Sequence, residues 1–446
     1  MSNSLVMGEF NSEKYWRSEN LSRLPEFSDK NSPDIILSMD ELLFSFCNDN
    51  DVLITRYRFN DSLKHYLNTI GFNFIVSGES VQKSIEESSK SIFQLMYENK
   101  DRISGVKAQI NSGTKFSPYS VVPYCDVISD DLNLLFHGAK LDVVKEVNSK
   151  VYSCKVSKSL NLKYGGDITY NSRELSEKGE KLLEKGSFLI KDSYGVSGKG
   201  NLLINSPGIL ERIVKHLESQ EKRGLASIFV VEPLLDRDID FSCGFKIGKN
   251  GDVKIVSIQK MINNNFAYCG SYTADQEFAA GLYKNKYFEI LEQVAHILYS
   301  DGYFGEVCLD SMILKSGDIV PIVEINARKS MGFINHRIDE YLSQFGQKGN
   351  LIFLNLGYRR ELAFEHLLVR MDKEGLIFYP GKTNGVMPLS ANTLFINKEL
   401  DNKEKADAVY KGRIYFSVIA EDEEKRESLI KAVRALFKSL LCNIYN

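Results

Sequence analysis

Short apolar runs alternate with segments of helical periodicity through the first third of the chain. A short apolar run fits a buried strand, and a longer segment with apolar positions at helical spacing fits an amphipathic helix. Strand and helix patterns follow one another in turn over residues 35–37, 40–47, 52–55, 61–69 and 72–76. This alternation predicts a Rossmann-like α/β domain over residues 1–145.

The end of the chain, residues 346–446, carries the same mixture of patterns. Residues 394–396 and 414–419 are strand-like. A closing helix is expected over residues 421–441, because apolar residues recur there at helical spacing: Leu429, Ile430, Val433, Leu436, Phe437 and Leu440. The pattern predicts a separate, small C-terminal α/β domain, which leaves residues 146–345 as the central region.

Residues 302–328 of the central region have the pattern of two strands joined by a short turn. We expect residues 316–318 to form the loop, since short loops that contain glycine commonly join antiparallel strands. A loop of these residues pairs Lys315 with Ile319. The pairing of every other position in the hairpin follows from that register.

Two acidic residues and an amide share one face of the expected hairpin. Counting outward from the turn brings Asp310 opposite Glu324, and Asn326 lies two residues further on the same face. The strands are otherwise rich in Val, Ile, Leu and Met, where an unpaired charge is costly. Neighbouring hard oxygen ligands suit Mg²⁺ that is bound together with nucleotide phosphates, so these are the predicted metal ligands.

A glycine-rich segment with two lysines, FLIKDSYGVSGKG, spans residues 188–200. Lys191 is expected at the end of a strand, ahead of the glycine loop. Backbone N–H groups of such a loop can close over phosphate oxygens, and the lysines add positive charge. The loop residues expected at the phosphates are Gly195, Ser197, Gly198, Lys199 and Gly200. The spacing is not that of a P-loop, and neither a GxGxxG motif after a strand nor the protein-kinase motif set is present.

In their order along the chain these motifs resemble the ATP-grasp superfamily of carboxylate–amine and carboxylate–thiol ligases. The resemblance extends over residues 145–345. It comprises an opening lysine, a strand-end lysine before a glycine loop, a strand that runs into an acidic hinge, and an acid followed by Glu-x-Asn-x-Arg. The matching residues are Lys150 (with Lys155 as the alternative), Lys191, Glu232, Asp240, Asp310, Glu324, Asn326 and Arg328.

The resemblance implies an ATP-grasp fold with an N-terminal Rossmann-like pre-ATP-grasp domain, and ATP and Mg²⁺ as cofactors. The beginning of the chain is also similar to peptide ligases and aminoacyl-carrier-protein ligases of secondary metabolism. That similarity lies in an aromatic opening segment, a Leu-Pro pair, and the DELLF and DVLIT sequences.

Roles for single residues follow from the resemblance. After Pro233, which has no N–H, the backbone of Leu234 or Leu235 would read the adenine edge. Asp240 would accept hydrogen bonds from the ribose hydroxyls, with Asp238 as the alternative.

The catalytic residues implied by the resemblance are Arg328, which would face the reacting carboxylate, and Lys199. The planar fork of an arginine suits both a carboxylate and an acyl phosphate. The residues that follow Arg328 are candidates to line the acceptor pocket: Ser330, Gly332, Asn335 and His336.

Composition limits the partners. The 446 residues include 56 Lys+Arg and 59 Asp+Glu, and the net charge of −3 gives no strong field toward nucleic acid or anionic membranes. Seven scattered cysteines without a CxxC pair, and six histidines without ligand spacing, predict neither a disulfide framework nor a zinc site. Without an apolar signal segment or membrane-spanning stretch, the sequence predicts a cytoplasmic protein.

The sequence therefore predicts an enzyme that activates a carboxylate as an acyl phosphate with ATP and passes the acyl group to an amine. The expected partners are a small-molecule carboxylate, such as an amino acid or peptide, and an amine acceptor; a homodimer is left open. The alternatives are acylation of a carrier-protein thiol, a small-molecule phosphotransferase, and a nucleotide-binding regulatory protein. The last is disfavoured because the complete metal set and Arg328 are retained.

Overall fold

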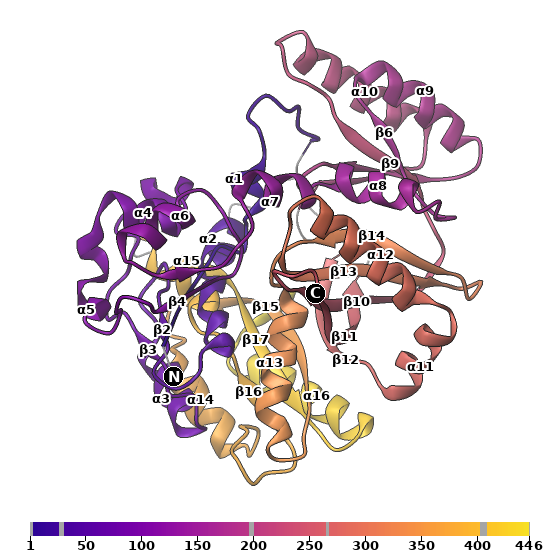
Figure 1. Ribbon diagram of the computed structural model, residues 1–446. Coiled ribbons are helices and arrows are strands. Elements are labelled where there is room, and N and C mark those ends of the chain that lie inside the picture. The colour runs from indigo at the N-terminus through magenta and orange to yellow at the C-terminus, as the bar shows by residue number, and fades with distance from the viewer. Residues whose placement is uncertain (1–2, 26–30, 196–199, 265–266, 402–407, 446) are drawn as a thin grey trace.

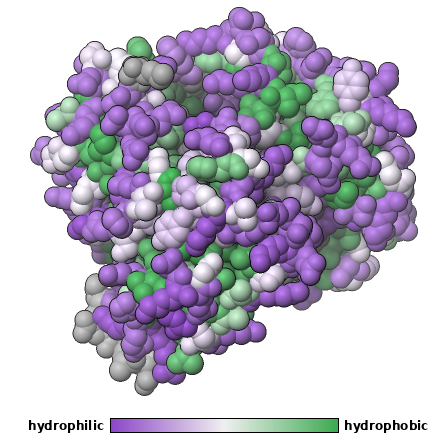
Figure 2. All heavy atoms as spheres, turned by 90° about the horizontal axis from the view of Figure 1, so that it is seen from below, coloured by the Kyte–Doolittle hydropathy of each residue, from purple (hydrophilic) through white to green (hydrophobic). Residues whose placement is uncertain are grey.

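The computed structural model describes residues 3–25, 31–195, 200–264, 267–401 and 408–445 (Figure 1). These residues contain a parallel sheet of five strands, an antiparallel sheet of four and an antiparallel sheet of nine. In the described part of the chain, no helix combines the length and apolar character needed to cross a membrane. The face shown in Figure 2 is mostly hydrophilic, with hydrophobic side chains in small, scattered groups.

The N-terminal sheet has the strand order β3–β2–β1–β4–β5, and each neighbouring pair is parallel. Its strands are β1 (Ser4–Met7), β2 (Val52–Leu53), β3 (Ile75–Val76), β4 (Lys115–Pro118) and β5 (Leu135–Phe136). The helices of this part are α1 (Glu13–Trp16), α2 (Ser32–Leu37), η1 (Ser38–Phe46, 3₁₀), α3 (Asp61–Thr69), η2 (Ile85–Ser89, 3₁₀), α4 (Ile92–Glu98), η3 (Lys100–Ile103, 3₁₀), α5 (Ser104–Lys107), α6 (Cys125–Asp131) and α7 (Leu141–Val147). Parallel strands joined through helices confirm the predicted Rossmann-like architecture.

One expected strand in this domain is wrong, because residues 35–37 lie in helix α2. Pro33 stands in the first turn of that helix, where its fixed φ is favourable and its missing N–H has no partner to lose. An apolar triplet is too short to display either period, so the sequence pattern could not separate the two structures. The helix expected over residues 61–69 coincides with α3.

A second, smaller sheet follows helix α8 (Lys150–Ser159) and has the order β6–β9–β7–β8. Its strands are β6 (Asp167–Thr169), β7 (Phe188–Asp192), β8 (Asn201–Ile204) and β9 (Phe229–Pro233). Helices α9 (Ser172–Leu183) and α10 (Pro207–Glu221) contribute apolar side chains to a core shared with this sheet. We call residues 167–233 the small-sheet subdomain; Figure 1 shows it at one end of the molecule.

The large sheet has the order β14–β13–β10–β11–β12–β15–β17–β16, with β18 paired to β15. Its strands are β10 (Arg237–Ile247), β11 (Val253–Asn264), β12 (Ala267–Thr273), β13 (Gly305–Leu314), β14 (Ile319–Asn326), β15 (Gly349–Arg359), β16 (Gly385–Pro388), β17 (Val409–Ile419) and β18 (Asn443–Tyr445). The helices of this part are α11 (Gln276–Lys284), α12 (Tyr287–Ser300), α13 (Met331–Ser343), α14 (Phe364–Lys373), α15 (Asn392–Glu399) and α16 (Glu423–Ser439).

Alternation along the strands gives the two faces of the large sheet different chemistry. Phe241, Cys243 and Phe245 of β10 are buried in a core that includes apolar residues of α11 and α12. Ser242, between them in sequence, points to the opposite face, where it pairs in register with Asp310 of β13. The polar face of the large sheet is therefore the one that carries the predicted metal ligands.

The C-terminal residues continue the large sheet, because β15 pairs with β12 and the remaining strands add to β15 and β17. The expected domain boundary at residue 345 thus falls within one hydrogen-bonded sheet, and the division into three domains stays a prediction. The expected closing helix corresponds to α16, and residues 414–419 lie in β17. The strand expected over residues 394–396 is wrong, since these residues belong to α15.

Glu41 of η1 explains why helix α15 begins where it does. Its carboxylate is fully buried and accepts hydrogen bonds from the backbone N–H groups of Ala391 and Asn392 at 3.0 Å and of Thr393 at 2.8 Å. These donors belong to the start of α15, where backbone N–H groups have no partner inside the helix. The N-terminal domain and the C-terminal residues are joined through this contact.

Glu41→Gln should lower the free energy of unfolding by about 2–4 kcal/mol, because a neutral amide cannot serve all of these N–H groups and places donors of its own in a buried site. Urea denaturation measures the change. Glu365→Gln, an exposed residue of α14, is the matched control and should differ from the unchanged protein by less than about 0.5 kcal/mol. Equal midpoints for the two variants would contradict the joining role of Glu41.

Candidate active site

The hairpin of β13 and β14 brings the two predicted acidic ligands together. Asp310 lies directly opposite Glu324 in the strand register, as predicted. The pair lies near the end of the hairpin that is far from the turn, and both side chains face the polar side of the large sheet.

The expected pairing next to the turn is wrong. Ile319 pairs with Ile313 instead of Lys315, so the turn is longer than the sequence suggests. A β-bulge between this pair and Asp310 restores the predicted register further along, and the bulged part of β14 contains Pro321. A proline without an N–H fits the interruption of a strand ladder at a bulge.

The two carboxylates carry more negative charge than their neighbours neutralise. Burial, and after it the nearby charge of Glu324, raise the pKa of Asp310 to about 7. Lys150, at the start of α8, forms an ion pair with Glu324 and donates a hydrogen bond to the backbone oxygen of Gly195 at 2.9 Å. A divalent cation beside these carboxylates would relieve their repulsion, so the donor set fits Mg²⁺.

The amide of Asn326 lies next to this pair. Its Nδ2 donates to Oδ2 of Asp310 at 2.9 Å, and its Oδ1 accepts from Nη2 of Arg328 at 3.1 Å. Its role as a metal ligand stays a prediction, and it requires the amide oxygen to turn toward the carboxylates. Among the described residues, no group of three or more His, Cys, Asp or Glu side chains is arranged to hold a metal ion. The candidate site has two carboxylates, which suits an ion that takes its remaining ligands from phosphate and water.

The structure distinguishes the two candidates for the opening lysine. Lys150 is buried and contacts Glu324. Lys155, further along the same helix, is exposed. Lys150 is therefore the lysine that shares a site with the acidic pair.

A cavity between the small-sheet subdomain and the hairpin is lined from both sides. Lys191, at the end of β7 as predicted, forms an ion pair with Glu232 of β9. Met312 and Ile322 of the hairpin contribute apolar surface to the same cavity. Lys150 and Lys163 line the same cavity, so three lysines, an acid and apolar side chains meet in one place.

The two backbone N–H groups predicted to read the adenine edge, those of Leu234 and Leu235, differ in their surroundings. The N–H of Leu234 donates to the backbone oxygen of Ser187 at 3.0 Å and is thereby used within the subdomain. Leu235 lines the cavity. Leu235 is the better placed of the two predicted adenine contacts.

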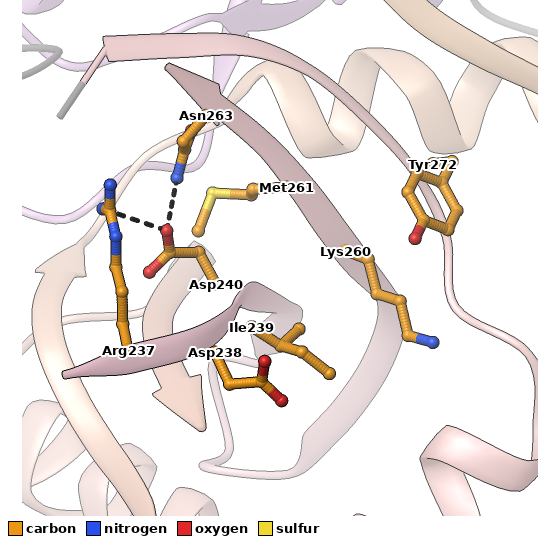
Figure 3. A pocket seen from close by; sticks show the side chains of 8 residues that line it. All are labelled: Arg237, Asp238, Ile239, Asp240, Lys260, Met261, Asn263 and Tyr272. Carbon is orange, nitrogen blue, oxygen red and sulfur yellow. Dashed lines mark hydrogen bonds and ion pairs between the residues drawn. The ribbon is translucent and has the colours of Figure 1, made fainter. Parts of the chain in front are cut away.

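A second hollow opens where β10 and β11 separate beyond the pair Phe241 and Lys260 (Figure 3). Asp240 is held there by Nδ2 of Asn263 at 2.8 Å and by Nη1 of Arg237 at 3.1 Å. Asp240 pairs in register with Met312, which lines the first cavity. Asp238 lines this hollow as well, and the choice between the two predicted ribose ligands stays a prediction.

The glycine loop joins β7 to β8. Gly200 has a φ of +86°, and a Cβ there would lie 3.0 Å from Cβ of Asp192, so a side chain would be strained at this position. Gly195 contacts Lys150 through its backbone oxygen. Three other predicted phosphate contacts lie outside the described residues: Ser197, Gly198 and Lys199.

Arg328, just past the end of β14, is buried among several acceptors. Its Nε and Nη2 both donate to Oε1 of Glu13, at 3.1 and 2.6 Å, and its Nη1 donates to the backbone oxygen of Lys329 at 3.1 Å. Burial lowers the pKa of the Arg328 guanidinium, but the charges of Glu13, Tyr119 and Glu324 and the hydrogen bonds to Glu13 together outweigh this effect, and the pKa is raised overall. Glu13 was missed by the sequence analysis, since a single acid in a short polar segment carries no signal of a contact with a residue so distant in sequence.

The four predicted acceptor-pocket residues begin helix α13. Ser330 is its N-cap residue, and Gly332 lies close to Gln259 and Ser242 on the polar face of the large sheet. Asn335 is fully buried and donates to Oε1 of Gln259 at 2.9 Å. His336 lies 3.6 Å from Glu340 of the same helix, and burial lowers its pKa. Their role in an acceptor pocket stays a prediction.

No family model matches the sequence, and no curated protein sequence matches it. Solved structures do match. Biotin carboxylase from Campylobacter jejuni has a TM-score of 0.53 at 13% identity, covering 100% of this chain and 92% of that one. N5-carboxyaminoimidazole synthetase from Staphylococcus aureus has a TM-score of 0.50 at 11% identity, with 97% of each chain covered.

An ADP complex of an N5-carboxyaminoimidazole ribonucleotide synthetase gives a TM-score of 0.51 at 10% identity, with 99% of this chain and 98% of that chain covered. At these identities the likeness concerns the fold. The whole chain, from the Rossmann-like sheet to the C-terminal strands, is covered by it. The chain therefore has the ATP-grasp fold, as its motifs suggest.

Proposed function

We propose that the protein is an ATP-dependent ligase that activates a carboxylate as an acyl phosphate and transfers the acyl group to an amine. The observation that carries this proposal is the register pair Asp310 and Glu324, half-buried on the polar face of the large sheet and next to Lys150. A paired acid site beside a lysine-lined cavity is what the binding of a metal–nucleotide complex requires.

Nucleotide and metal would have distinct places. The cavity between the sheets would take the base, with the backbone of Leu235 at its edge and Met312 at its face. Lys150 and Lys191 would balance the charge of the phosphates, and Asp310 with Glu324 would hold Mg²⁺. Bound there, ATP supplies the phosphoryl group and the ion neutralises its charge; transfer of this kind depends mainly on positioning and electrostatics.

Solved structures with the same fold support this use of the cleft. An enzyme from Aspergillus clavatus with a TM-score of 0.50 was crystallised with ADP and an aminoimidazole ribonucleotide. A biotin carboxylase domain from Hydrogenobacter thermophilus, also with a TM-score of 0.50, was crystallised with MgADP and bicarbonate. Both complexes combine a nucleotide with a small second substrate.

Arg328 would act on the side of the reacting carboxylate. It is adjacent to the acidic pair through Asn326, and the fixed charge of an arginine suits an anion whose charge grows during phosphoryl transfer. For the substrate, we propose an amino acid or peptide of specialised metabolism, on the resemblance of the opening segment to peptide ligases.

If an acyl phosphate forms, hydroxylamine added in place of the acceptor should be converted to a hydroxamate, because a small strong nucleophile intercepts an activated acyl group. Amino acids and small peptides are screened with ATP and Mg²⁺ for ADP release, and positive reactions are assayed for hydroxamate. Arg328→Lys should reduce hydroxamate formation by about tenfold or more, since lysine cannot present the same planar fork. ADP release with a stable phosphorylated product and no hydroxamate would identify a phosphotransferase instead.

Asp310→Asn should abolish the Mg²⁺-dependent part of nucleotide binding, because it removes a charge from the metal site without changing its volume. Isothermal titration calorimetry with a non-hydrolysable ATP analogue, with and without Mg²⁺, measures this. The variant should unfold at no lower urea concentration than the unchanged protein, since the charge removed is half-buried and repelled by Glu324. Magnesium-dependent binding of ordinary strength in the variant would rule out the metal assignment.

A further inference from the structure

A short helix of the N-terminal domain contacts both sides of the proposed site. Glu13 begins α1 and Arg17 follows its last residue, and the N–H of Arg17 donates to the backbone oxygen of Glu13 at 3.0 Å. The two side chains are thus one helical turn apart, about 6 Å along the axis. Figure 1 shows α1 between the N-terminal domain and the small-sheet subdomain.

The first contact of α1 is on the side of the proposed reacting carboxylate. Oε1 of Glu13 accepts from both Nε and Nη2 of Arg328, and the two side chains are only 5% and 10% exposed. Four hydrogen bonds to Glu13, Asn326 and Lys329 fix the plane of the guanidinium. The other oxygen of Glu13, Oε2, is buried and has no hydrogen-bond partner among the described residues.

The second contact of α1 is on the nucleotide side. Nη1 of Arg17 forms an ion pair with Asp192, the last residue of β7, directly after Lys191. Oδ1 of Asp192 also accepts from the N–H of Tyr194 at 3.0 Å, at the start of the glycine loop. The ion pair therefore holds the point where the phosphate-binding strand ends.

The chain after Arg17 runs onto the small-sheet subdomain and is joined to it. Leu21 forms a parallel bridge with Ala226, in which the N–H of Ser22 donates to Ala226 at 2.9 Å and the N–H of Ala226 donates to Asn20 at 2.8 Å. Gln220 exchanges two hydrogen bonds with the backbone of Arg23, at 2.8 and 3.0 Å.

Leu24 completes the attachment, because its side chain is buried in the core of the small-sheet subdomain together with residues of β7 and α10. At the other end, Trp16 is buried against the N-terminal domain and its Nε1 donates to the backbone oxygen of Val121 at 2.8 Å. Residues 13–24 are therefore anchored in both parts of the molecule.

We infer that Glu13 and Arg17 are positioning residues of the proposed ligase, which hold Arg328 and the end of β7 in a fixed relation through one turn of α1. This inference rests on the proposed function and adds a coupling to it. Nucleotide bound at Lys191 and carboxylate bound at Arg328 are aligned with each other through α1, rather than only through the large sheet.

Glu13→Gln tests the acyl side of this coupling. The variant should lower kcat for ADP release by about tenfold, because a misplaced guanidinium no longer matches the transition state, while KM for ATP stays within about twofold. Glu13→Asp should recover part of kcat. Glu87→Gln is the matched control, since Glu87 is paired with Arg102 in the N-terminal domain, at 18% and 13% exposure, and should leave both constants unchanged.

Two outcomes of this kinetic test would overturn the inference. An unchanged kcat in Glu13→Gln would mean that Arg328 needs no support from α1. A lower KM for the carboxylate with an undiminished kcat would mean that Glu13 occupies the place of the substrate anion and is displaced by it.

The nucleotide side can be tested without any carboxylate, because Trp16 is the one tryptophan of the chain and lies between the two positioning residues. Its fluorescence is recorded while Mg²⁺ and a non-hydrolysable ATP analogue are added, and calorimetry measures binding in parallel. The emission should change and saturate with the calorimetric Kd in the unchanged protein. In Arg17→Gln the nucleotide should still bind, but the emission should no longer respond.

Arg102→Gln is the matched control for this experiment, because Arg102 pairs with Glu87 and also donates to a backbone oxygen, that of Val81. It should keep the full emission change. Nucleotide binding without any response of Trp16 in the unchanged protein, or a full response in Arg17→Gln, would overturn the coupling. Failure of the proposed function would look different: no carboxylate would provoke ADP release, whatever Trp16 does.

Discussion

The proposed site depends on two carboxylates that are brought together on neighbouring buried strands. Asp310 and Glu324 repel one another, and their partial burial makes the repulsion costly. Among the described lysines, Lys150 pairs with one of them, Glu324. The site is thus electrostatically incomplete as it stands, and a divalent cation carrying phosphate would complete it. The proposal of a nucleotide site in the cavity beside it therefore has a physical argument as well as a resemblance behind it.

The arrangement of the sheets supplies the rest of the site. The large sheet presents its polar face, and the small-sheet subdomain faces it with Lys191 and Glu232. If both sheets contact the proposed nucleotide, the large sheet and the small-sheet subdomain must be aligned with each other. Helix α8 contributes to this alignment through Lys150, and α1 does so through Glu13 and Arg17. The N-terminal domain is in this way part of the proposed site, because it holds the arginine on the acyl side.

Local patterns predicted part of the structure. The hairpin and the strand-end position of Lys191 follow from alternation and turn chemistry, whereas the predicted pairing of Asp310 with Glu324 holds because a bulge offsets the error at the turn. The pairing next to the turn was predicted wrongly, because the bulge at Pro321 shifts the register of the two strands. The apolar triplets at residues 35–37 and 394–396 were assigned to strands and are helical. Their helices start at a proline and at amide groups bound by Glu41, and neither signal lies within the triplet itself.

Contacts between distant segments were beyond the reach of sequence patterns. Glu13 and Arg328 are far apart in the chain, and no periodicity connects them. The same holds for the attachment of Leu24 to the small-sheet subdomain. The attachment of the C-terminal strands to the central sheet was missed for a related reason, since strand pairing between β12 and β15 is set by packing of the whole sheet and not by the strands' own residues.

The central claim, an acyl phosphate formed at this site, is tested most directly by isotope transfer. The carboxylate that supports ADP release is labelled with ¹⁸O, and the products are analysed by mass spectrometry after complete conversion with an amine acceptor. The account predicts that one labelled oxygen per turnover appears in inorganic phosphate, because the carboxylate oxygen becomes the bridge to phosphorus and leaves with it. Label in AMP, or inorganic phosphate that carries no label, would contradict it.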